Sequence, residues 1–164
     1  MFKDKKVWII NLVLFLITIA TDVCFIVLGM PYIFKTISSV LFVILGIINF
    51  IFIFKLEQRN KLFKYFMLLG LVFACLGDIV LIDYFIYGAI LFAIGHVFFF
   101  VAYSILHKIN WKDIVIALAI FAVALVVILA LPIFSFNGML PVVIVYAFII
   151  SFMLGKAISN YVFM

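Results

Sequence analysis

The sequence predicts an all-α, polytopic transmembrane helix bundle of about six helices, in a single domain that covers residues 1–164. Hydrophobic residues make up 72% of the chain and charged residues 10%, with a mean hydropathy of +1.58. A soluble domain has roughly 45–50% apolar and about 25% charged residues. The apolar residues also form runs of about 20, the helix length that crosses the ~30 Å hydrocarbon core of a bilayer.

Six such runs follow one another along the chain, at residues 7–28, 34–54, 65–82, 85–106, 114–133 and 139–158. Isoleucine, valine and phenylalanine also favour strands. An open sheet cannot span lipid, however, and the ten-residue alternation of a β-barrel strand is absent from the sequence. Because only Asp83 and Tyr84 separate the third run from the fourth, we expect these two helices to be antiparallel neighbours.

The basic residues predict how the bundle sits in its membrane. All of them except Lys35 fall on one side if the amino terminus is inside: Lys3, Lys5, Lys6, Lys55, Arg59, Lys61, Lys64, Lys108, Lys112 and Lys156. The positive-inside rule therefore places both termini in the cytoplasm, and we expect a multi-pass protein of the bacterial plasma membrane. The net charge of +5 then marks a face near anionic lipid and does not indicate nucleic-acid binding.

Polar residues inside the second and third runs are the first candidates for a functional site. Lys35, Ser39 and Asn49 share one helical face, within a stripe that advances by three or four residues: 35, 39, 42, 46 and 49. On the third helix, small residues at 70 and 74 lead to Asp78 with the same spacing. An ionised side chain at the bilayer centre costs at least ~2.5–3.5 kcal/mol, so such residues usually have a function.

The other runs add single polar residues. His96 and Tyr103 lie seven residues apart on one face of the fourth helix, Asp22 interrupts the first and Tyr146 the sixth. We expect one shared interior in which Lys35, Asp78 and His96 converge. Each residue also has a structural explanation: an ion pair that fixes packing, an interhelical hydrogen bond, an interfacial anchor or a core aromatic ring. A metal is not expected, because the only other histidine, His107, falls at the inner interface, and no cofactor is expected.

Three stretches of the chain resemble the YhhN family of membrane proteins, the lysoplasmalogenase-like family. Phe34-Lys35 resembles the F-K-P-L motif that opens its second helix, with Thr36 in place of the proline. Residues 76–81 resemble its L-G-D-x-x-L motif, which contains Asp78. Residues 88–96 resemble its G-x-x-x-F-x-x-x-H motif, which ends at His96, and Tyr103, Pro141 and Tyr146 fit its later aromatic and proline positions.

The resemblance implies a membrane-embedded hydrolase that cleaves the vinyl ether bond of lysoplasmalogens, with a membrane lipid as its substrate. Asp78 and His96 would then be catalytic, as general acid and water-activating group, and Lys35 would bind the substrate phosphate. Tyr103 and Tyr146 would contact the substrate, with Asp22, Ser39 and Asn49 in supporting positions. The family has about eight helices, so the resemblance also implies that this chain is short at its carboxyl end.

Other classes of function stay open at this point. A catalytically inactive or truncated family member could have a structural, lipid-binding or small-solute transport role with the same charged residues. The sequence does not predict the oligomeric state. Lipid turnover in detergent separates the hydrolase from the other classes, and flux in proteoliposomes identifies a transporter.

The predicted orientation is tested by cysteine labelling at the connection between the second and third helices. An Arg59→Cys variant should resist a membrane-impermeant thiol reagent in intact cells and react after permeabilisation, because the positive-inside rule places residue 59 in the cytoplasm. Labelling from outside intact cells would overturn the orientation.

Overall fold

The computed structural model describes residues 5–29, 32–56, 61–130 and 138–163, without the side chains of residues 5–7 and 53–56. These residues form helices that are all long and apolar enough to cross a membrane. The helical class predicted from composition is confirmed. The helices are α1 (Lys5–Leu28), α2 (Ile33–Leu56), α3 (Lys61–Leu81), α4 (Phe85–Leu106), α5 (Trp111–Ala130) and α6 (Leu140–Phe163).

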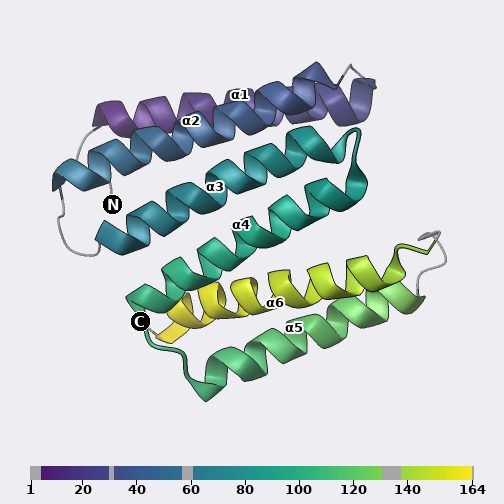
Figure 1. The fold of residues 1–164 in the computed structure, drawn as a ribbon. Coiled ribbons are helices and arrows are strands. Elements are labelled where there is room, and N and C mark those ends of the chain that lie inside the picture. Colours follow the sequence, from purple (N-terminus) through teal and green to yellow (C-terminus); the bar gives the residue numbers. More distant parts are fainter. Residues whose placement is uncertain (1–4, 30–31, 57–60, 131–137, 164) are drawn as a thin grey trace.

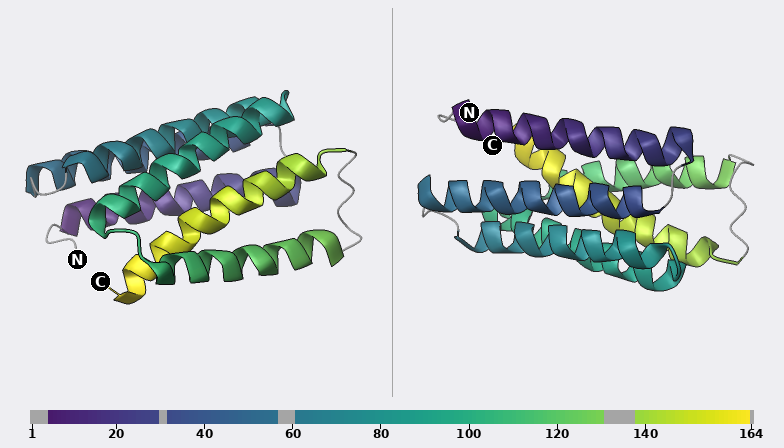
Figure 2. Two further views of the ribbon diagram at one scale, coloured as in Figure 1. Left: turned by 60° about the horizontal axis from the view of Figure 1, so that its bottom comes forward. Right: turned by 90° about the horizontal axis from the view of Figure 1, so that it is seen from above.

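The helices pack in an open row. In the described part of the chain, α1 contacts α2, α2 contacts α3, α3 contacts α4, α4 contacts α6, and α6 contacts α5. Figure 1 shows this order, from α1 behind α2 at the top to α5 at the bottom. The other views show α1 to α5 along roughly one direction, with α6 tilted across α5 (Figure 2). The predicted antiparallel neighbours α3 and α4 lie side by side.

Several helix boundaries differ from the sequence prediction by one to five residues, and polar residues explain three of these differences. α3 begins at Lys61 instead of residue 65, so its first turn holds two lysines. α5 begins at Trp111 instead of residue 114, because Asn110 caps it. α6 continues to Phe163 instead of residue 158, because Ser159 and Asn160 are buried against neighbouring helices.

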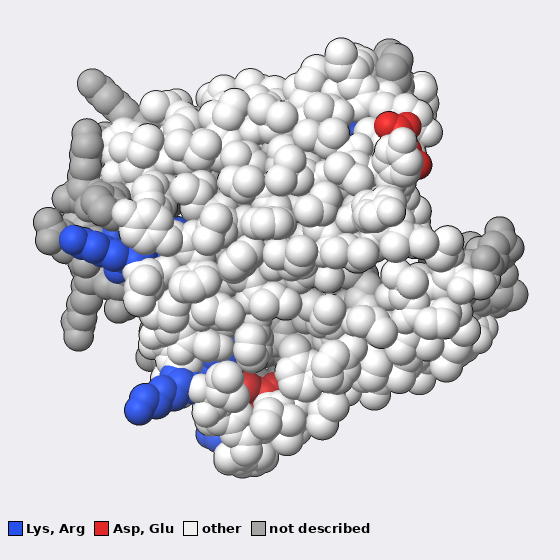
Figure 3. All heavy atoms as spheres, viewed as in Figure 1, with Lys and Arg blue, Asp and Glu red and all other residues white. Residues whose placement is uncertain are grey.

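The charged residues collect at the two ends of the bundle. Figure 3 shows lysines at one end of the visible face and acidic residues mainly at the other. We call the first the basic end; α1, α3 and α5 begin there, and it includes Lys61, Lys64, Lys108, Lys112 and Lys156. The opposite end contains Lys35, Asp78 and Asp83. Which end faces the cytoplasm stays a prediction.

Some residues used for the orientation fall outside this description. Lys3 and Arg59 are not among the described residues, and the side chains of Lys5, Lys6 and Lys55 are not described.

Small residues bring α5 and α6 close together. Along α6 a small buried residue occurs at every fourth position: Ala147, Ser151, Gly155 and Ser159. A Cβ atom on Gly155 would lie 2.7 Å from the Cα of Ala117 on α5, closer than packed atoms allow. This is the close backbone approach that small residues give membrane helices.

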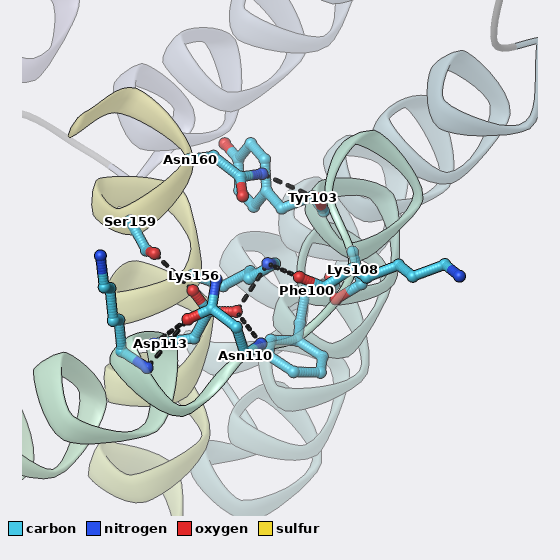
Figure 4. A network of polar contacts seen from close by, with 10 residues as sticks. Phe100, Tyr103, Lys108, Asn110, Asp113, Lys156, Ser159 and Asn160 are labelled. Carbon is cyan, nitrogen blue, oxygen red and sulfur yellow. Dashed lines mark hydrogen bonds and ion pairs between the residues drawn. The ribbon is translucent and has the colours of Figure 1, made fainter. Parts of the chain in front are cut away.

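A buried ion pair joins α5 to α6 at the basic end (Figure 4). Lys156 Nζ lies 2.6 Å from Asp113 Oδ2 and 3.1 Å from the carbonyl oxygen of Lys108. The Ser159 hydroxyl donates to Asp113 Oδ1. The side chains of Lys156 and Asp113 are 0% and 4% exposed. Both charges are therefore removed from solvent and satisfied by direct partners.

The same carboxylate takes part in the cap of α5. The Asn110 N–H donates to Asp113 Oδ2 at 2.9 Å, while Asn110 Oδ1 accepts from the N–H groups of Lys112 and Asp113. This reciprocal pattern is a capping box formed by an asparagine and an aspartate. Asn160 adds a hydrogen bond from Nδ2 to the Tyr103 carbonyl oxygen, at 2.8 Å, which ties α6 to α4.

Breaking this pair should destabilise the bundle. Lys156→Met leaves the Asp113 carboxylate buried without its cation, and we expect the protein to lose about 3–5 kcal/mol of stability. The measurement is unfolding in detergent, followed by circular dichroism. The combination of Asp113→Leu with Lys156→Met should recover much of the loss, because no unpaired charge remains.

Lys108→Met is the matched control, since it removes an exposed lysine at the same end and keeps the backbone carbonyl group. Equal losses in Lys156→Met and Lys108→Met would show that the buried pair contributes nothing specific.

Candidate functional site

Lys35 and Asp78 meet between α2 and α3, as their helical stripes predicted. Lys35 Nζ lies 3.4 Å from Asp78 Oδ1. The Ser39 hydroxyl, one turn after Lys35, lies 2.5 Å from Asp78 Oδ2 and 3.1 Å from the Lys35 carbonyl oxygen. The carboxylate thus has a cation at one oxygen and a hydroxyl donor at the other.

This group of residues borders a cavity of about 130 Å³ between α1, α2 and α3. Ala74, one turn before Asp78 on α3, leaves space beside the carboxylate because its side chain is small. A second acid, Asp22 on α1, lines the same cavity. The complete lining consists of Thr18, Asp22, Lys35, Ser38, Ser39, Phe42, Leu71, Ala74, Cys75 and Asp78. We call this the Asp78 cavity.

The Asp78 cavity lies near the end of the bundle opposite the basic end. Asp78 is three residues before the last residue of α3, and Lys35 two residues after the first residue of α2. At 1.5 Å per residue, they are about 5 Å and about 3 Å from these helix ends. Their side chains are 20% and 33% exposed. The pair therefore lies close to one end of the bundle and is partly accessible from outside the protein.

His96 lies in a different place, between α4 and α6. It is buried, and its Nδ1 is 2.6 Å from the carbonyl oxygen of Phe92, one turn earlier. The Tyr146 ring on α6 packs edge-on against the imidazole, at 5.5 Å between centroids. His96 is not among the residues that line the Asp78 cavity.

The structure therefore brings together Lys35, Ser39, Asp22 and Asp78 around one cavity. His96 is outside the lining of this cavity and packs against Tyr146 on α6.

Tyr103 and Asn49 lie towards the basic end of the bundle. Tyr103 is three residues before the end of α4, and its carbonyl oxygen accepts from Asn160. Asn49 exchanges two hydrogen bonds of 2.9 Å with the Asn11 side chain on α1. Tyr103 and Asn49 are thus on the helical faces predicted for the site, but they lie closer to the other end of the bundle than the Asp78 cavity does.

The sequence prediction missed several polar residues that the fold gathers. Thr18 and Ser38 line the Asp78 cavity, and the Asp113–Lys156 pair joins α5 to α6. Ser38 directly precedes Ser39, and the spacing from Asn110 to Asp113 before an apolar run is that of a capping box. Those two signals were present in the sequence.

The described residues contain no group of three or more histidine, cysteine or acidic side chains close enough to hold a metal ion. What the Asp78 cavity offers is a carboxylate, a second acid, a cation and three hydroxyl groups. Such a set can transfer protons and bind an anion.

Comparison with known proteins supports one family. The search of curated proteins and the search of solved structures both give no match. The family model for the YhhN family matches residues 30–164. The match contains Lys35, Ser39, Asp78 and His96, and begins after the Thr18 and Asp22 of α1. The match covers most of the chain, and the protein therefore belongs to the YhhN family.

Proposed function

We propose that the protein is a lipid hydrolase that cleaves the vinyl ether bond of lysoplasmalogens, giving a fatty aldehyde and a glycerophospho head group. The observation that supports this most directly is the Lys35–Asp78 pair on a small polar cavity at one end of an apolar bundle. A single-chain lipid has the same division, with an anionic head at the membrane surface and a chain in the hydrocarbon core. Membership of the YhhN family supports the same class of substrate.

The chemistry needs a proton donor beside the double bond. Protonation of the outer vinyl carbon gives an oxocarbenium ion, and water then adds to the carbon bonded to the ether oxygen. The added water loses one proton to a base, which gives a hemiacetal. The hemiacetal hydroxyl then loses its proton and the bond to the head-group oxygen breaks, which releases the aldehyde. Of the two protons from water, one ends on the head-group oxygen as a hydroxyl group and one returns to the acid. We assign the proton donor to Asp78, because it lies at the cavity and a positioned carboxyl is a common general acid.

Lys35 explains how substrate binding would prepare this acid. The phosphate of the substrate is an anion that competes with Asp78 for the ammonium group. When Lys35 turns to the phosphate, Asp78 Oδ1 is released from its ion pair and can approach the double bond of the substrate. Ser39, 2.5 Å from Asp78, keeps the carboxyl oriented during this exchange.

Water must be activated on the same side of the substrate. Asp22 lines the Asp78 cavity, whereas His96 is not among its lining residues and has its Nδ1 against a backbone carbonyl oxygen. We therefore assign water activation to Asp22 and give His96 a positioning role, through its packing against Tyr146.

The assignment of Asp78 is tested by aldehyde release from a lysoplasmalogen, with purified protein in detergent. Asp78→Asn keeps the shape of the side chain and removes its titratable proton, so turnover should fall by at least about 10²-fold. Lys35→Ala should mainly raise KM, because it removes a phosphate contact made in ground state and transition state alike.

Asp83→Asn is the matched control, since it removes an exposed carboxylate at the same end of α3, outside the Asp78 cavity. Its activity should equal that of the wild type. Full activity in Asp78→Asn would rule out this carboxyl as the acid. Absence of aldehyde from the wild-type protein would favour a lipid-binding or structural role.

The choice between Asp22 and His96 is tested by comparing two variants. Asp22→Asn should lower kcat by about 10²-fold and leave the unfolding temperature close to that of the wild type. His96→Gln should mainly lower the unfolding temperature, since it disturbs a buried ring that contacts two helices. A loss of kcat in His96→Gln with unchanged stability, and normal turnover in Asp22→Asn, would return water activation to His96.

A further inference from the structure

An apolar slot lies between α2 and α3, next to the Asp78 cavity and extending from it towards the basic end of the bundle. It has a volume of about 340 Å³ and is bordered by residues of these two helices alone. Phe42 on α2 and Leu71 on α3 line both the slot and the Asp78 cavity, so the two spaces adjoin. Figure 1 shows α2 and α3 running side by side along the length of the bundle.

We infer that this slot holds the hydrocarbon chain of the substrate, with its head group in the Asp78 cavity; this rests on the proposed lipid hydrolase function. From Lys35 to Phe50, the two spaces together follow α2 for about 22 Å at 1.5 Å per residue. That is most of the ~30 Å hydrocarbon core. A chain along this path would lie parallel to the lipid chains outside.

The lining of the slot suits a flexible hydrocarbon chain. Leucine, methionine and phenylalanine side chains border most of it, and apolar walls with few polar groups are typical of sites for apolar ligands. An α-helix with side chains is about 10–12 Å wide, too wide for a space of this volume. A single alkyl chain is the occupant that matches both the chemistry and the size.

Gly46 sets the width of the slot at its middle. A Cβ atom at this position would lie 2.2 Å from Cδ1 of Leu71, so the leucine side chain occupies the space that the glycine leaves. A larger residue at position 46 would push Leu71 into the slot. The slot would then be narrower on the side of the Asp78 cavity that faces the basic end, and lipids with long hydrocarbon chains should bind less well.

The head end of the slot determines which bond reaches the acid. Leu71 is seven residues, or two turns, before Asp78 on α3, and Phe42 is one turn after Ser39 on α2. A chain that fills the slot up to Phe42 and Leu71 would leave its first atoms beside Ser39 and Asp78. In a lysoplasmalogen these first atoms are the vinyl ether carbons, the ones that the proposed chemistry protonates.

The experiment uses photochemical labelling, which needs no turnover. The probe is a long-chain alkyl ether lysophospholipid that has a diazirine halfway along its chain and lacks the vinyl bond. After irradiation of the wild-type protein in detergent, we expect label on α2 near Gly46 and on α3 near Leu68. An excess of the unlabelled lysophospholipid should prevent labelling, and glycerophosphocholine, which has no chain, should not.

Label confined to α4 near Ala93 and α6 near Val145 would overturn the inference. A separate apolar groove of about 280 Å³ lies there, bordered by both residues. In that case aldehyde release would still decide the proposed function by itself. Label in the slot without any aldehyde release would support the chain site and contradict the hydrolase.

A variant tests the width of the slot. Gly46→Leu should lower kcat/KM for long-chain relative to short-chain lysoplasmalogens by about tenfold, in the range that small changes in an apolar pocket give. Ala119→Leu adds a side chain at an exposed position on α5, away from the slot, and should leave the ratio unchanged. An unchanged ratio in Gly46→Leu would contradict a chain bound beside this residue.

Discussion

An ionised side chain in an apolar helix bundle must face an opposite charge or a hydrogen-bond donor, because lipid cannot solvate it. This constraint orients four of the helices. Lys35 and Asp78 turn α2 and α3 towards each other at one end, and Lys156 and Asp113 do the same for α6 and α5 at the basic end. Small residues between these points allow the helices to approach, as Gly155 does at Ala117.

The two ion pairs differ in the space around them, and this difference is the reason for placing only one of them in the proposed site. The Lys156 and Asp113 side chains are 0% and 4% exposed, and their partners fill the positions around the carboxylate. The Lys35 and Asp78 side chains are 33% and 20% exposed and border a cavity. A substrate could separate the second pair without unfolding the bundle, whereas opening the first would leave two buried charges unpaired.

Much of this arrangement could be predicted from the sequence, because composition and helical period are local signals. The apolar runs predicted the helices, and the spacing of Lys35, Ser39 and Asp78 predicted faces that do meet. The spacing of polar residues shows which face of a helix they share. It does not show which other helix packs against that face, or how far along the bundle the contact lies. Asn49 shares a face with Lys35 and pairs with Asn11, and His96 faces Tyr146 on α6.

The Asp113–Lys156 pair is a second contact that the sequence did not predict. The two residues are 43 positions apart in sequence, and α6 packs between α4 and α5 in an order that the sequence does not reveal. By the positive-inside rule alone, Lys156 was assigned to the membrane surface, whereas the structure buries it completely. A lysine near a helix end can thus be an orientation signal and a buried partner at once.

The contribution of α1 divides the candidate site into two parts. Lys35, Ser39 and Asp78 lie within the segment that the family model matches, and the apolar slot is formed by α2 and α3 alone. Thr18 and Asp22 come from α1, which precedes that segment and contacts only α2 among the described helices. A helix with a single neighbour can shift without repacking the other five. In the proposed function, the head-group end of the site therefore depends on α1, whereas the chain slot and Asp78 do not.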